Sequence, residues 1–374
     1  MRDELQRIEV PGEHEARERT WRVVATAFAE RQPVERRPRM VRPAIAIAVA
    51  AAALAAVLSP PGRAVLDEIR EAVGVERAQP ALFSLPTPGR LLVASDAGVW
   101  VVQQDGSKRL LGEYREASWS PFGRFVVAAR QNELAALEPD GDVRWTLARP
   151  GVRFPRWTGT ETDTRIAYVD RTGIRVVAGD GTGDRLLVPG ARGPIAWRPG
   201  ADHQLAHAGP SGRVAVIDVD TDDVLWRSRQ DGKIAALEWS SNGRRLVATR
   251  LGGRDALAVY TARGALYTGF RTPRGAVTGS AMRPGSHARA VALTVGNQAR
   301  LFMPGVPGSA LSGPGVLRDL AWSPDARWLL VGWPAADQLV LVRADGVRVR
   351  AVSNVSEQFR SRSFPRIEGW CCEP

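Results

Sequence analysis

The stretch Ala321–Trp328 reads AWSPDARW, and a close copy, SWSPFGRF, occupies Ser118–Phe125. Looser copies are centred on Trp157, Trp197, Trp239 and Met282, the last of which has lost the aromatic residue. Counted from Trp119 to Trp322, successive copies are 38 to 43 residues apart. A repeat of this length is one supersecondary unit that cannot bury its apolar face alone, so neighbouring copies must stack.

A Gly- or Asp-rich turn recurs in phase with the motif, roughly two dozen residues after it. Successive turns are 35 to 42 residues apart, and they fall near Gly106, Gly141, Gly181, Thr221, Arg263, Gly305 and Gly346. From Arg90 onward the chain between these turns consists of short apolar runs rich in β-branched residues, which is the pattern of β-strands. The last repeat shows the order clearly: WSPDARWLLVGW, then QLVLVR, an Ala-Asp-Gly turn, and VRVRAV.

Four short strands in about 40 residues are typical of one blade of a β-propeller. Seven turns predict an all-β, seven-bladed propeller over residues 90–374, with a six- or eight-bladed ring as the alternative. The first repeat has a turn at Gly106 but no Trp-Ser-Pro motif, while the final segment FPRIEGWCC (Phe364–Cys372) follows a complete repeat. We therefore expect this tail to supply the innermost strand of the first blade and close the ring.

The motif is similar to that of TolB-type and WD-like propeller repeats, in which Trp-Ser-Pro-Asp-Gly leads into an apolar strand. The resemblance covers residues 90–372 and is carried best by the copies at Ser118 and Ala321. It implies a propeller fold and extracytoplasmic contact with other proteins, although propellers also host unrelated activities.

An apolar run, AIAIAVAAAALAAVL, fills Ala44–Leu58 and predicts one transmembrane helix over residues 43–59. A cleaved signal peptide and a buried soluble helix are the alternatives. However, 43 residues precede the run, and no polar position interrupts it at helical spacing. Five arginines lie on its N-terminal flank, at positions 31, 36, 37, 39 and 42. The positive side of a span stays in the cytoplasm, so we expect a membrane protein whose propeller is extracytoplasmic.

Residues 1–42 then form a cytoplasmic tail. Its helix at Glu15–Arg31, with Trp21 and Phe28 on one face, is either a docking helix or a poorly ordered juxtamembrane segment. Residues 60–89 are expected to contain a second short helix and a Pro-rich linker. This layout also resembles that of transmembrane anti-sigma regulators.

The formal charge of +11 raises the question of nucleic-acid binding. Lys108 and Lys233 are the only lysines, so the basic residues are almost all arginine, a bias typical of a GC-rich genome such as an actinobacterial one. The arginines are spread along the repeats beside 40 acidic residues and match no nucleic-acid-binding motif. We interpret them as a solvated surface that can contact a protein or an anionic envelope component, not nucleic acid.

No residues are predicted to be catalytic, cofactor-binding or metal-binding. His203 and His207 are expected on a strand, too far apart to share a metal. The acidic stretches Asp180–Asp184 and Asp218–Asp223 coincide with the repeat's turns, where Asp and Gly are favoured by the backbone. Cys371 and Cys372 are expected to be free thiols, because a bond between sequence neighbours closes a strained ring.

The recurring tryptophans at 119, 157, 197, 239 and 322 are interpreted as residues that pack between blades. The leading hypothesis is therefore a non-enzymatic, membrane-anchored scaffold or sensor. The alternative is a propeller enzyme of the hydrolase, lactonase or quinone-dependent dehydrogenase type, with channel-lining residues invisible to linear motifs. Acidic or histidine side chains converging on the channel would favour the enzyme. A third hypothesis couples the outer domain to the Trp21 helix in signalling.

Overall fold

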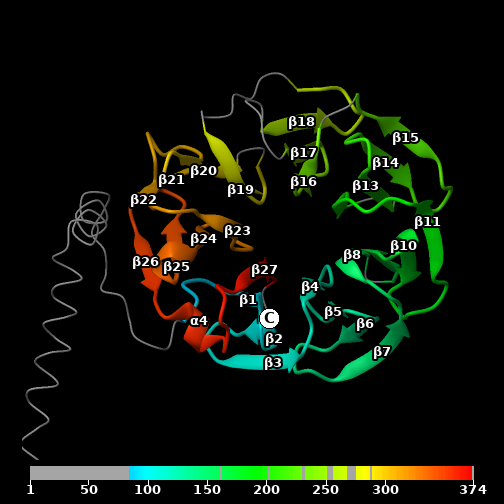
Figure 1. The fold of residues 1–374 in the computed structure, drawn as a ribbon, viewed down its shortest axis with the longest axis horizontal. Helices are drawn as coiled ribbons and strands as arrows, with labels where there is room; N and C mark the ends of the chain where they lie inside the picture. The colour runs from blue at the N-terminus through cyan, green and yellow to red at the C-terminus, as the bar shows by residue number, and fades with distance from the viewer. Residues whose placement is uncertain are drawn as a thin grey trace, which may run out of the picture. The chain divides into compact units, whose positions relative to one another are not determined.

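Seven antiparallel β-sheets stand around a common centre and form a closed β-propeller (Figure 1). The computed structural model describes residues 84–160, 162–200, 203–229, 232–250, 256–267, 275–286 and 289–372. The prediction of an all-β, seven-bladed ring is confirmed, and the six- and eight-bladed alternatives are wrong. The apolar segment Ala44–Leu58 and the helices expected on either side of it lie outside the described residues. Within the described ranges, no helix has the length and apolarity needed to cross a membrane.

Each blade is a meander whose first strand lies nearest the centre. Blade 1 consists of β27 (Arg366–Cys371), β1 (Arg90–Ser95), β2 (Gly98–Val102) and β3 (Lys108–Gly112). Blade 2 consists of β4 (Glu116–Trp119), β5 (Val126–Arg130), β6 (Glu133–Leu137) and β7 (Val143–Ala148). Blade 3 consists of β8 (Arg153–Gly159), β9 (Thr164–Val169), β10 (Gly173–Ala178) and β11 (Arg185–Pro189). Blade 4 consists of β12 (Ile195–Trp197), β13 (Gln204–Ala208), β14 (Val214–Asp218) and β15 (Val224–Arg227).

The remaining blades follow the same order. Blade 5 has three described strands, β16 (Ile234–Trp239), β17 (Arg245–Arg250) and β18 (Leu257–Thr261). Blade 6 consists of β19 (Ala276–Met282), β20 (Arg289–Val295), β21 (Gln298–Phe302) and β22 (Leu311–Pro314). Blade 7 consists of β23 (Arg318–Trp322), β24 (Trp328–Trp333), β25 (Gln338–Arg343) and β26 (Val349–Val352). The short helices η2 (Pro334–Ala336) and α4 (Val355–Gln358) lie beside blade 7.

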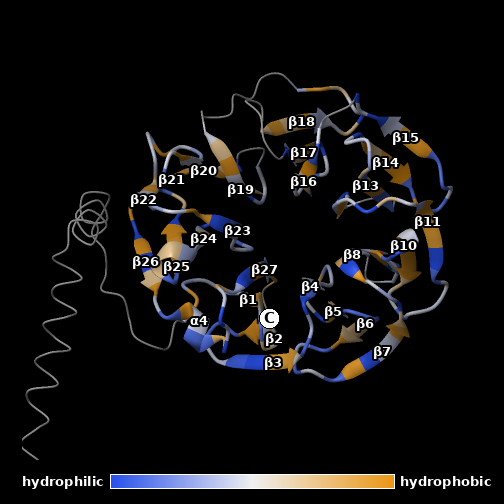
Figure 2. Ribbon diagram, in the orientation of Figure 1, coloured by the Kyte–Doolittle hydropathy of each residue, from blue (hydrophilic) through white to orange (hydrophobic). Residues whose placement is uncertain are grey.

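The sequence pattern of each strand follows from its position in the blade. The second and third strands are covered by neighbouring blades on both faces, so they are almost continuously apolar; all six residues of β24 are buried. The outermost strand has one face in solvent, and β7 alternates between exposed and half-buried residues accordingly. Figure 2 shows the resulting mixture of hydrophobic and hydrophilic residues along the blades.

The Trp-Ser-Pro motif forms the turn between the first and second strands. In blade 7 the Ser323 hydroxyl accepts the Trp328 N–H at 2.9 Å and donates to Asp325 Oδ1 at 2.6 Å. The backbone N–H of Ser323 also donates to the carbonyl of Trp328. The turn therefore satisfies its own polar groups, which explains why serine recurs directly after the tryptophan.

The motif tryptophans pack between blades, as predicted. Trp119, Trp197, Trp239 and Trp322 are each less than a tenth exposed. At three junctions an arginine of the preceding blade stacks on the tryptophan and donates to the carbonyl four residues after it. These pairs are Arg90 on Trp119 with Gly123, Arg198 on Trp239 with Gly243, and Arg283 on Trp322 with Ala326. The same contact recurs because the same residues recur in phase.

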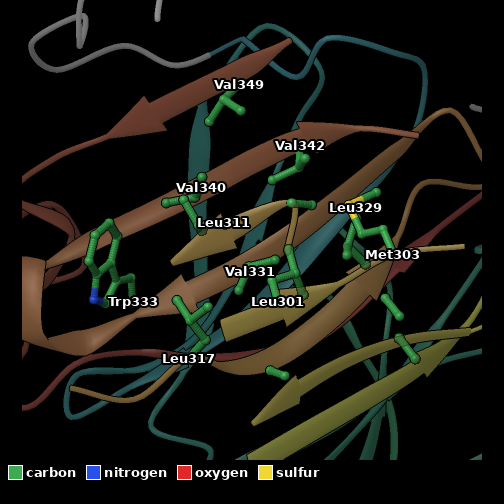
Figure 3. Close-up of a cluster of buried hydrophobic side chains, with 14 of the residues drawn as sticks. Leu301, Met303, Leu311, Leu317, Leu329, Val331, Trp333, Val340, Val342 and Val349 are labelled. Carbon is green, nitrogen blue, oxygen red and sulfur yellow. The ribbon is translucent and has the colours of Figure 1, made fainter. Parts of the chain in front are cut away.

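The apolar faces of adjacent blades form the core. Figure 3 shows the largest cluster, in which Leu301 and Leu311 of blade 6 pack against Leu329, Val331 and Val340 of blade 7. Neighbouring blades thus bury each other's apolar surface, as the repeat length required.

The ring is closed by its two ends. Strand β27 pairs antiparallel with β1, and the register runs from Arg90 opposite Cys371 to Ala94 opposite Arg366. The predicted closure by the C-terminal tail is therefore confirmed. It removes the open edge that β1 would otherwise present.

Two expectations about the chain ends need correction. The free-thiol expectation is wrong, because the sulfurs of Cys371 and Cys372 are joined in a disulfide. Cys371 ends β27, and Cys372 turns back with a φ of +44°, which brings the two side chains together. In the Pro-rich linker, Leu85 and Thr87 are buried against the propeller, so its last residues belong to the domain.

Candidate functional site

The innermost strands carry acidic side chains, one of the two residue types whose convergence on the channel would favour the enzyme hypothesis. They are Glu116 on β4, Glu238 on β16, Asp319 on β23 and Glu368 on β27. Two of them bind the backbone of the next blade: Glu116 accepts the Phe154 N–H, and Glu238 Oε1 accepts the Met282 N–H at 2.9 Å. These carboxylates therefore fasten consecutive blades to each other.

Burial raises the pKa of the Glu238 carboxyl to about 7, although the Met282 N–H and the positive charge of Arg289 oppose the shift. Burial also raises the pKa of Glu368 to about 7, against the opposing charge of Arg366, whose guanidinium lies 3.0 Å away. Such values suit proton transfer. In the part of the chain that the structure describes, however, no three His, Cys, Asp or Glu side chains are grouped to hold a metal ion.

A second feature is a pocket of about 390 Å³ between blades 2 and 3, which we call the blade 2–3 pocket. It opens on the face that carries the Trp-Ser-Pro turns. Four aromatic residues line it: Phe122, Phe125, Trp145 and Trp157. The rings of Phe125 and Trp157 are stacked across the two blades, with centroids 6.0 Å apart and an interplanar angle of 15°. The pocket is therefore mainly apolar, which is typical of sites that bind an apolar group.

The wall of this pocket is held by a contact between the outer parts of the two blades. The Trp145 indole donates a 2.9 Å hydrogen bond to the carbonyl of Gly179. The ring lies over Gly181, where an added Cβ would come within 2.8 Å of it. Gly181 also has a φ of +87°, so the turn needs glycine both for its backbone and for the close approach of the indole.

Arginines lie at the rim. Arg144 stacks over the Phe125 ring at 5.7 Å and pairs with Glu138 at 2.9 Å. Arg124 is exposed on the turn beside Phe122. The rim also contains Asp180, whose Oδ1 already accepts the N–H and the hydroxyl of Thr182. Since Glu138 already pairs with Arg144, the positive charge that the rim offers next to the apolar pocket comes from Arg124.

A third feature lies on the opposite face, near blade 1. A cavity of about 840 Å³ is lined by four arginines, Arg115, Arg318, Arg362 and Arg366, and we call it the arginine basin. Two of these residues have structural contacts: Arg318 donates to the Phe364 carbonyl, and Arg366 donates to the Arg115 carbonyl. Asp96 and Glu113 also line the basin, and Arg318 and Arg366 pair with Asp319 and Glu368, so much of its positive charge is already balanced. Half of its arginines also hold the closing segment in place.

The remaining residues that the sequence singled out do not form a site. His203 Nδ1 lies 2.8 Å from Asp220 Oδ2, whereas His207 is buried on β13 with its pKa lowered by burial to about 4. Asp218 Oδ1 accepts the N–H groups of Asp220 and Thr221, which is the turn chemistry expected. Trp157 differs from the other motif tryptophans, because it is only half-buried and one side of it lines the blade 2–3 pocket.

Comparison with known proteins supports the fold. No protein family and no curated protein matches the sequence. The structure is similar to the β-propeller domain of Cps50 (Swd1) from Myceliophteria thermophila, with a TM-score of 0.51 and 14% identity over 75% of this chain and 98% of that one. It is also similar to the C-terminal WD40 domain of Sif2, with a TM-score of 0.52 and 14% identity over 75% of this chain and 87% of that one. The protein thus has a WD40-type β-propeller fold.

Proposed function

We propose that this protein is a non-enzymatic scaffold or sensor that binds a protein partner through its propeller. The observation that carries the proposal is the blade 2–3 pocket, an aromatic cavity that has the exposed Arg124 at its rim and opens on one face of a closed ring. A ring whose blades pack on both sides is a rigid support for such a site. An anionic envelope component is the alternative ligand, and the arginine basin is the surface that would suit it.

We further propose that the propeller is anchored in the cell membrane by a single helix at residues 43–59 and is extracytoplasmic. The support is the apolar run Ala44–Leu58 and the arginines before it. External protease added to intact spheroplasts is expected to digest the propeller and to spare Trp21. Protection of the propeller would place it in the cytoplasm. A soluble form beginning near Ser59 would identify the segment as a cleaved signal.

A propeller enzyme remains the second candidate, because Glu238 and Glu368 have pKa values of about 7 on the innermost strands. The hydrogen bond from Met282 to Glu238 and the ion pair of Glu368 with Arg366 favour a structural role instead. The variant Glu368→Gln distinguishes an enzymatic role of this carboxyl from a structural one. Loss of a measured turnover with an unchanged melting temperature would support the enzyme.

Binding is tested by purifying the full-length protein from detergent-solubilised membranes and identifying proteins that accompany it in stoichiometric amount. The residues after Leu58 include 41 basic and 32 acidic ones, so part of the attraction is electrostatic. We expect a partner that is retained at low salt and released at high salt. Absence of any stoichiometric partner at low salt would contradict the scaffold function.

A further inference from the structure

The turn of blade 2 departs from its equivalents in blades 5 and 7. The third residue after the motif tryptophan is Asn242 in blade 5 and Asp325 in blade 7. In both, Oδ1 accepts the serine hydroxyl, at 2.9 and 2.6 Å, and the N–H two residues on, at 3.1 and 3.0 Å. In blade 2 this position is Phe122, whose ring cannot accept either hydrogen bond.

Burial of Phe122 does not compensate for the loss of these two hydrogen bonds. Its side chain is 47% exposed, although a phenylalanine normally contributes to stability by leaving water. The substitution therefore gives up a turn acceptor and places a large apolar ring in solvent. Positions that break a structural rule of the fold without a compensating contact are frequently functional. Phe122 lies at the mouth of the blade 2–3 pocket, so the exposed ring and the cavity belong to one surface.

The volume and the charge of this surface indicate which kind of ligand it can bind. The pocket's volume of about 390 Å³ is near the lower end of the range for ligand sites, roughly 300–1,000 Å³, and suits one large apolar side chain. Arg124, beside Phe122, makes no side-chain hydrogen bond or ion pair with the described residues. Arg144, which is held over Phe125, already pairs with Glu138, so Arg124 carries the positive charge that this surface offers to a ligand. An apolar anchor with carboxylates next to it is complementary to both parts.

We infer that the blade 2–3 pocket docks an acidic segment of a partner protein. One aromatic or branched aliphatic side chain enters between Phe122 and Trp157, and a neighbouring Asp or Glu residue pairs with Arg124. This inference rests on the proposed scaffold function and names the surface and the partner's chemistry. The side chain replaces water against the aromatic walls, and the carboxylates set specificity and the salt dependence.

The test measures binding of fluorescein-labelled peptides of one length to the full-length protein in mild detergent, by fluorescence anisotropy. Each probe has a central Phe, flanked by Glu, Gln or Lys. We expect the Glu-flanked peptide to bind about tenfold or more tightly than the Lys-flanked one. Phe122→Asn, which restores the acceptor found in blade 5, is expected to keep or raise the melting temperature and to weaken the Glu-flanked peptide about tenfold.

Arg124→Gln is expected to weaken the Glu-flanked peptide severalfold, whereas Arg244→Gln, at the same turn position in blade 5, leaves it unchanged. Equal binding by Phe122→Asn, equal binding of the Lys-flanked peptide, or no binding of any probe would overturn the inference. Retention of a stoichiometric partner by Phe122→Asn would also overturn it while leaving the scaffold function intact. A wild-type protein without any partner would instead contradict the scaffold function itself.

Discussion

The ring of Phe125 stacks on the ring of Trp157 across the boundary between blades 2 and 3, with their centroids 6.0 Å apart. At three other boundaries an arginine covers the motif tryptophan and closes the space above it. Between blades 2 and 3 the covering group is the ring of Phe125, from the turn directly before β5, and Trp157 remains half-exposed. The replacement of the covering arginine by Phe125 at this boundary therefore accompanies the pocket on which the proposed function depends.

Removal of the closing strand is expected to destabilise the whole ring. Deleting Phe364–Pro374 takes away β27, which pairs with β1 at five positions and contributes the buried Trp370 to the core. We expect the melting temperature to fall by more than about 10 °C, or folding to fail, because blade 1 would lose its innermost strand. Thermal unfolding followed by circular dichroism measures this. A control that lacks only residues 373 and 374 should melt like the wild type, and equal melting of both truncations would refute the closure.

The indole over Gly181 predicts a difference between two neighbouring glycines. Gly181 and Gly183 both have a positive φ, but an added Cβ meets Trp145 at 2.8 Å in the first and nothing within 4 Å in the second. Gly181→Ala should therefore cost about 1–3 kcal/mol more than Gly183→Ala, since both share the backbone strain and only one has the clash. Chemical denaturation of the two variants gives the comparison. Equal costs would show that Trp145 does not lie on this turn.

The arginine between blades 4 and 5 is expected to stabilise their contact. Arg198 stacks on Trp239 at 5.7 Å and donates to the Gly243 carbonyl at 2.9 Å. Arg198→Ala should lower the free energy of unfolding by about 1–2 kcal/mol. Arg244→Ala, an exposed position on the adjoining turn, should have little effect. Similar losses in the two variants would argue that the stack contributes nothing specific.

Glu238 is expected to make the protein less stable as the pH rises. Its pKa is raised from 4.5 to about 7, so the folded state holds a proton that the unfolded state releases between these values. The free energy of unfolding should fall over that window by on the order of 3 kcal/mol, since each unit of pKa difference corresponds to about 1.4 kcal/mol. Glu238→Gln keeps the acceptor for Met282 but cannot ionise.

Relative to the wild type, Glu238→Gln should therefore be about equally stable near pH 4 and more stable near pH 8. Denaturant unfolding across this range measures the difference. Glu357→Gln, at an exposed position of α4, serves as the control and should follow the wild type. A Glu238→Gln variant with the wild-type pH dependence would show that the pKa of this carboxyl is the same in the folded and unfolded states.

The repeat made the architecture predictable, because the spacing of the Trp-Ser-Pro motifs and the fixed distance from each motif to its turn are visible in a linear sequence. The tryptophans, the turn acids and the closing tail all follow from that phase. The candidate site was not predicted, since it depends on Phe122, Phe125 and Trp145, which meet Trp157 only when two blades stack. One signal was present: SWSPFGRF has Phe122 where AWSPDARW has Asp325, although nothing in the sequence shows that this ring lies beside a cavity. The pairing of Cys371 with Cys372 also depends on a backbone turn that composition does not reveal.

The most direct test of the account is site-specific photo-crosslinking in living cells. A benzophenone amino acid placed at position 122 keeps an aromatic side chain at the pocket mouth, and the same group at position 242 occupies the equivalent turn of blade 5. We predict one discrete protein adduct from position 122 under ultraviolet light and none from position 242. Loss of that adduct in the Arg124→Gln background would match the charged rim. No protein adduct at position 122, or the same adducts at both positions, would contradict the claim that this propeller binds a protein partner at the blade 2–3 pocket.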